Sequence, residues 1–87
     1  KTLSPEMDKL MKERRSYAAA KAEGGEMLPV VAAGETDFAA QVIVPVVSGG
    51  DCLGIVALLD KNEGAKTEAE TVKLTRLAAD ILANQFE

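Results

Sequence analysis

The chain has 87 residues and a formal net charge of −4, so it can form no more than one small domain. The acidic balance argues against direct binding to a nucleic-acid backbone, because such binding normally requires a basic face. With no His and a single Cys, the sequence excludes Ser-His-Asp and Cys-His catalysis, imidazole metal sites and an internal disulfide.

The first predicted element is a short helix near the N-terminus. Ser4 is a favourable N-cap, and Pro5 fits the first helical position, where a missing N–H costs nothing. Met7, Leu10 and Met11 then follow at helical spacing, which indicates one buried face.

Two strands are predicted after this helix. Residues 16–21 favour a short strand that ends before a Gly-Gly pair. Residues 27–33 favour a second strand, and Pro29 places it at a sheet edge or at a strand start, because Pro cannot donate to a ladder.

The clearest pattern is a pair of apolar runs, residues 38–47 and 52–59, around the turn residues 48–51. Two such runs joined by Gly-Gly predict an antiparallel hairpin. Neither run alternates polar with apolar residues, so we expect the hairpin in the middle of a sheet that is covered on both faces. Pro45 indicates a bulge in the first of these strands.

The last predicted element is a helix of about 20 residues that runs to the C-terminus. Thr67 and Glu70 match a capping box at its start. From Val72 onward, apolar residues cover about 200° of the helix surface, roughly twice the usual core-facing stripe. The helix therefore needs two covering partners: the sheet, and either the first helix or a helix from another chain. The predicted oligomer interface consists of Leu74, Leu77, Ala78, Ile81, Leu82 and Phe86; packing within one chain is the alternative.

Few residues are candidates for chemistry. Tyr17 and Phe38 are candidate ligand-binding residues, with core packing as the alternative. Cys52 is interpreted as a small apolar strand residue, with a reactive thiol as the alternative. Glu23 and Glu26 lie in a polar segment rather than an apolar pocket, so acid–base catalysis is not expected from them. We predict no catalytic residue, no metal ligand and no cofactor.

The order helix, strands, helix predicts an α+β domain with an antiparallel sheet flanked by helices and a long C-terminal helix. The hairpin segments Val44-Pro45-Val46-Val47, Gly49-Gly50-Asp51 and Leu53-Gly54-Ile55-Val56 resemble the central hairpin of GAF domains. Arg14-Arg15-Ser16, and Leu77-Ala78-Ala79 followed by Leu82-Ala83-Asn84-Gln85-Phe86, resemble the C-terminal GAF-like domain of the stage V sporulation protein T family of AbrB-type transcription regulators.

This resemblance implies that residues 1–87 are one GAF-like regulatory domain, cut at its N-terminus from a longer protein. In the family, DNA is bound by a separate AbrB-type domain, and the terminal helices associate into bundles between subunits. The implied role is regulation, homo-oligomerisation and possible sensing of a small-molecule effector for a sporulation transcription regulator. The alternative is an effector-binding sensor domain of another bacterial transcription regulator. The lone Cys and the lack of any long apolar run suggest a cytoplasmic protein without a membrane span.

Overall fold

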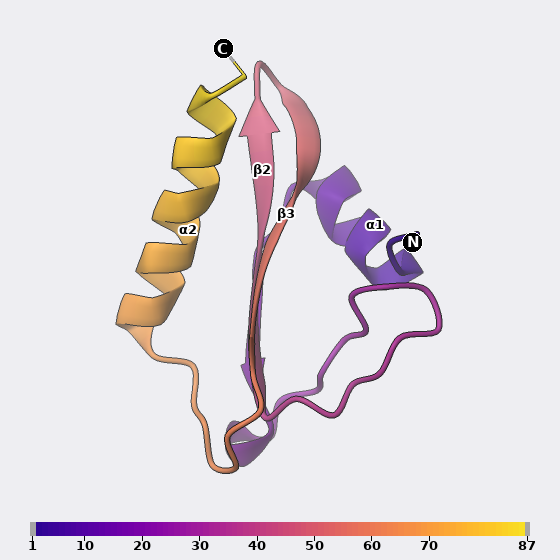
Figure 1. The fold of residues 1–87 in the computed structure, drawn as a ribbon, viewed down its shortest axis with the longest axis vertical. Coiled ribbons are helices and arrows are strands. Elements are labelled where there is room, and N and C mark those ends of the chain that lie inside the picture. Colours follow the sequence, from indigo (N-terminus) through magenta and orange to yellow (C-terminus); the bar gives the residue numbers. More distant parts are fainter. Residues whose placement is uncertain (1, 87) are drawn as a thin grey trace.

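The computed structural model describes residues 2–86, which form a three-stranded antiparallel sheet between two helices (Figure 1). The sheet order is β1-β2-β3, and α1 and α2 lie on opposite faces of it. The predicted α+β class with an antiparallel sheet and a C-terminal helix is confirmed. In chain order the elements are α1 (Pro5–Glu13), β1 (Tyr17–Ala20), the short 3-10 helix η1 (Lys21–Glu23), β2 (Ala40–Ser48), β3 (Asp51–Asp60) and α2 (Ala69–Asn84).

The start of α1 is the one that the sequence predicts. The hydroxyl of Ser4 accepts a hydrogen bond from the backbone N–H of Met7 at 3.1 Å, and Pro5 occupies the first turn. Met7 and Leu10 are buried against Ile43 of β2. The predicted strand at residues 16–21 is also confirmed, since it becomes β1.

The predicted strand at residues 27–33 is wrong. This segment is a loop, and its backbone pairs with the segment before α1 through an isolated bridge between Leu3 and Val31. Pro29 has no N–H for a ladder, and the backbone of Leu28 bonds to the side chain of Gln41 instead of to a strand. Ala33 then takes a left-handed conformation with φ of 56°, which ends any extended run.

The predicted hairpin is confirmed as β2 and β3. Its turn residues Gly49 and Gly50 have φ of 60° and 86°, which side chains with a Cβ rarely adopt. A bulge is present, but it lies beyond Pro45: Val46 pairs with Gly54 and Val47 with Cys52, so the extra residue belongs to β3. Pro45 is tolerated in β2 because the pairing of β1 with β2 stops at Ile43.

The expectation that the whole hairpin lies in mid-sheet is correct for β2 only. Val42 and Val44 of β2 are buried against α2, and Ile43 is buried against α1. Within residues 2–86 no strand pairs with the outer edge of β3, because the four residues of β1 pair with β2 alone. Leu58 and Leu59, on the two faces of β3, are consequently both exposed.

The predicted capping box of the last helix is wrong. α2 begins at Ala69, and its N-cap, Glu68, makes no side-chain capping bond. The backbone N–H and the hydroxyl of Thr67 both donate to the carboxylate of Glu23, at 3.0 and 2.8 Å. Thr67 therefore bonds to the carboxylate of Glu23 in η1, and not to Glu70 as the capping box predicts.

Candidate functional site

The strongest candidate site is the exposed apolar surface of α2. The inner side of this helix is built from small residues, and Thr75, Ala79 and Ala83 are buried there. Ala79 and Ala83 pack on a row of valines from β2. Because these side chains are short, the helix lies close to the sheet, and its larger apolar residues are left on the other sides.

These larger residues make up the predicted interface, and we call them the outer face of α2. Five of them are between 46% and 67% exposed, and Ala78 is half-buried. α1 does not cover them, since it lies across the sheet (Figure 1). Of the two second partners that the sequence left open, α1 is therefore excluded, and a helix from another chain stays a prediction. The outer face comprises Leu74, Leu77, Ala78, Ile81, Leu82 and Phe86.

An apolar groove of about 270 Å³ continues the outer face toward the sheet edge. Leu74 and Ala78 line it from α2, and Val56 and Leu58 line it from β3. The exposed apolar surface is therefore larger than the helix alone, and it extends from α2 to the free edge of the sheet.

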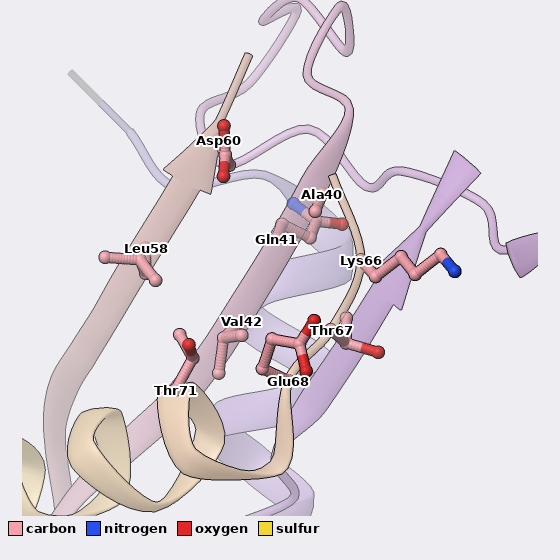
Figure 2. Close-up of a pocket in the computed structure, with 9 residues that line it drawn as sticks. All are labelled: Ala40, Gln41, Val42, Leu58, Asp60, Lys66, Thr67, Glu68 and Thr71. Atoms are coloured by element: carbon pink, nitrogen blue, oxygen red, sulfur yellow. The ribbon is translucent and has the colours of Figure 1, made fainter. Parts of the chain in front are cut away.

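A second cavity, of about 230 Å³, lies where the first turn of α2 meets the ends of β2 and β3 (Figure 2). Val42 and Leu58 form its apolar wall, while Asp60 and Glu68 contribute carboxylates. Asp60 also accepts a hydrogen bond from the backbone N–H of Asn62 at 2.8 Å. The amino-acid sequence does not reveal this cavity, because its walls come from three separate segments that by themselves indicate only strands, a turn and a helix cap.

The predicted ligand-binding residues, Tyr17 and Phe38, lie together but in a packed cluster. Phe38 is buried with Ala19 and Met27, and Tyr17 packs against the same cluster. The phenol of Tyr17 donates to the backbone carbonyl of Glu26 at 2.6 Å. Neither aromatic side chain lines the cavity at α2 or the groove beside β3. Ligand contact at these two residues stays a prediction.

Other chemistry is sparse in the described part of the chain. Cys52 is half-buried, and its thiol donates to the backbone carbonyl of Gly54 at 3.4 Å. Residues 2–86 contain no group of three or more acidic or Cys side chains placed to hold a metal ion. None of the helices in this range has the length and apolar character that a membrane crossing requires.

No curated protein matches the chain. The family model described as "Stage V sporulation protein T C-terminal, transcription factor" matches residues 1–87. The resemblance to the stage V sporulation protein T family, based on residues 14–16 and on the last helix, is therefore confirmed over the full sequence. The chain belongs to the family of stage V sporulation protein T C-terminal domains, which is a family of transcription factors and not of enzymes.

Proposed function

We propose that residues 1–87 are a GAF-like regulatory domain whose main task is to join the subunits of a sporulation transcription regulator. Family membership supports the role in transcription and sporulation. The observation that carries the oligomerisation role is the outer face of α2, where Leu74, Leu77 and Ile81 are each more than half exposed. The site of action is the cytoplasm, where the bacterial chromosome lies, and a separate domain contacts DNA.

Leaving this apolar surface in water costs free energy. Burying apolar surface contributes about 25 cal/mol per Å², and monomeric proteins seldom expose a large continuous apolar patch. The outer face of α2 and the groove beside β3 share Leu74 and Ala78, so they form one such patch. A second subunit would remove both from water.

A double substitution tests this role. Leu77→Glu combined with Ile81→Glu places two charges in the interface, and we expect a folded monomer by circular dichroism and light scattering. Arg76→Glu, an exposed change on the polar side of the same helix, serves as the matched control and should keep the mass of the unchanged protein. An unchanged protein that is already monomeric at high micromolar concentration contradicts the proposal.

A second role, sensing of a small molecule, is favoured by the cavity at the start of α2 (Figure 2). Its volume suits a small metabolite, and its wall combines apolar side chains with the carboxylates of Asp60 and Glu68. A ligand that binds the folded state raises the melting temperature, and the shift grows with the logarithm of the ligand concentration relative to its Kd. We therefore expect one member of a panel of amino acids, nucleotides and cyclic dinucleotides to shift the melting temperature.

Two variants locate that ligand. Thr71→Met fills the cavity and should abolish the shift, because Thr71 lines it from the first turn of α2. Tyr17→Phe tests the alternative position, since it removes the phenol hydroxyl and keeps the ring beside Phe38. The absence of any shift at millimolar ligand contradicts a sensing role and leaves oligomerisation untouched.

A further inference from the structure

We propose that the cavity at the start of α2 binds a small aliphatic amine with a net positive charge, such as a short diamine, whose ammonium groups bond to Asp60 and Glu68. This inference rests on the proposed sensing role, and it names the chemical class of the ligand. The cavity lies on the α2 side of the sheet, whereas Tyr17 packs on the α1 side.

The floor of the cavity consists of two neighbouring pairs in the sheet. Val42 pairs with Leu58 across β2 and β3, and Ala40 pairs with Asp60 two residues further along. Side chains two residues apart share a face of a sheet, so these four all lie on the α2 side. Ala40 has the smallest side chain of the four, which leaves space beside the carboxylate of Asp60. Residues 66–68, just before α2, form part of the opposite wall.

The connection between β3 and α2, which includes this wall, is held by hydrogen bonds near both of its ends. The backbone N–H and the hydroxyl of Thr67 donate to the carboxylate of Glu23 at 3.0 and 2.8 Å. The backbone N–H of Asn62 donates to the carboxylate of Asp60 at 2.8 Å. The cavity is therefore formed before a ligand binds, and binding does not have to order its wall.

Two carboxylates of the cavity have no positive partner in the described part of the chain. Neither Asp60 nor Glu68 forms an ion pair within residues 2–86. Lys66 also lines the cavity, but its side chain extends away from both carboxylates (Figure 2). Glu68 is the N-cap residue of α2 and makes no side-chain capping bond. The cavity therefore carries negative charge that a cationic ligand would neutralise.

The rest of the cavity suits a short hydrocarbon chain. Val42 and Leu58 provide an apolar wall for methylene groups, while an ammonium group has three N–H donors for a carboxylate. A volume of about 230 Å³ holds about eight non-hydrogen atoms, if each takes roughly the 30 Å³ of a water molecule in the liquid. A diamine of about four or five carbons is within this limit.

Other classes of ligand match the cavity less well. The phosphate groups of nucleotides and cyclic dinucleotides have the same sign of charge as Asp60 and Glu68, and these molecules exceed the volume. Calcium requires about six to eight oxygen ligands, and residues 2–86 contain no group of three or more acidic or Cys side chains placed for a metal. Among amino acids, lysine is favoured because its net charge is positive.

Calorimetric titration with matched ligands tests the need for positive charge. We expect diaminopentane, with an amine at each end, to bind more tightly than pentylamine, and pentylamine to bind more tightly than the neutral pentanol. Lysine should bind more tightly than norleucine, which lacks the side-chain ammonium. The Kd of diaminopentane should rise with added salt, because salt screens the attraction between ammonium and carboxylate.

Two substitutions locate the ammonium groups. Asp60→Asn keeps an acceptor for the N–H of Asn62 but removes the charge, and we expect the Kd of diaminopentane to rise about tenfold because Asp60 is half-buried. Glu68→Gln, at an exposed position, should raise it about threefold. Glu70→Gln removes the same charge from a residue of α2 that does not line the cavity, and as the matched control it should stay within about twofold. Melting curves without ligand establish that all three variants fold.

The other outcomes separate this inference from the sensing role. If a neutral or anionic ligand shifts the melting temperature, Thr71→Met abolishes that shift and the amines do not bind, the sensing role stands and the inference is overturned. Equal binding of diaminopentane and pentanol also overturns it, as does amine binding that Asp60→Asn and Glu68→Gln leave unchanged. If no ligand, amines included, shifts the melting temperature at millimolar concentration, the sensing role itself is overturned.

Discussion

The side-chain amide of Gln41 pairs with both backbone polar groups of Leu28. The N–H of Leu28 donates to Oε1 at 2.6 Å, and Nε2 donates to the carbonyl of Leu28 at 3.0 Å. Gln41 is 1% exposed. The side chain of Gln41 therefore provides the donor and the acceptor that the backbone of a neighbouring strand would otherwise provide. These two hydrogen bonds hold the loop against the sheet.

Replacing Gln41 tests the strength of this contact. Gln41→Leu keeps the approximate volume but leaves the N–H and C=O of Leu28 without their partner, and we expect it to lower the free energy of unfolding by about 1–3 kcal/mol. Urea denaturation measures the change. Gln85→Ala, at an exposed glutamine, is the control and should change stability by less than about 0.5 kcal/mol. Equal stability of Gln41→Leu and the unchanged protein contradicts the structural role.

The same contact explains where sequence reasoning succeeds and fails. The hairpin and both helices were predicted because their signals are local: the apolar runs of 38–47 and 52–59, the Gly49-Gly50 turn and the Ser4 cap. Residues 27–33 have the composition of a strand, but their backbone partners are a side chain 13 residues away and the segment before α1. Apolar composition alone does not reveal such a partner.

The hydroxyl of Ser4 connects the start of α1 to this loop, and its loss is the second prediction. Ser4 is fully buried; it accepts from the N–H of Met7 and donates to the carbonyl of Pro29. Ser4→Ala removes the cap and leaves the Pro29 carbonyl without that donor, so we expect a loss of about 1–2 kcal/mol in unfolding free energy. Ser16→Ala, at an exposed serine, should have little effect in the same thermal melts. If Ser16→Ala is less stable than Ser4→Ala, the Ser4 hydroxyl does not have this structural role.

At the candidate site, too, features set by neighbouring residues could be predicted from the sequence, and features set by contacts between distant residues could not. The broad apolar arc of α2 is visible in the sequence, and the exposure of Leu77 and Ile81 agrees with it. The capping box failed because Thr67 has a better acceptor in Glu23, 44 residues earlier in the chain. The cavity at the start of α2 was missed for a related reason: Val42, Leu58 and Glu68 meet only in the folded chain.

The contact between Glu23 and Thr67 makes a pH-dependent contribution to stability. The hydrogen bonds from the backbone N–H and then the hydroxyl of Thr67 lower the pKa of the Glu23 carboxyl below its usual value. A lowered pKa in the folded state means that this contribution is present above the usual glutamate pKa and is lost as the pH falls through the lowered value. Glu23→Gln should therefore be less stable than the unchanged protein at neutral pH, and the difference should shrink in acid.

Urea denaturation at neutral pH and at about pH 3, below the usual glutamate pKa, measures that difference. Glu63→Gln removes the same charge from a side chain that makes no hydrogen bond within residues 2–86, and it is the matched control. If the difference in unfolding free energy between Glu23→Gln and the unchanged protein is the same at both pH values, the ionisation of Glu23 does not contribute to stability.

Two glycines give the last prediction, because they differ in what surrounds them. A Cβ added to Gly25 would lie 2.8 Å from the Cβ of Ala19 and 2.9 Å from the backbone N of Ala20, closer than such atoms approach in proteins. The chain turns back on β1 here, and the N–H of Gly25 donates to the carbonyl of Ala20 at 2.8 Å. A Cβ added to Gly54 meets nothing within 4 Å.

We therefore expect Gly25→Ala to lower the free energy of unfolding by about 1–3 kcal/mol, because both neighbours belong to the sheet and cannot move away freely. Gly54→Ala should leave stability unchanged or raise it by up to about 1 kcal/mol, since alanine restricts the unfolded chain and fits a strand. Urea denaturation of the two variants side by side gives the comparison. If Gly25→Ala is as stable as Gly54→Ala, the close approach of the η1 turn to β1 is not what fixes glycine at position 25.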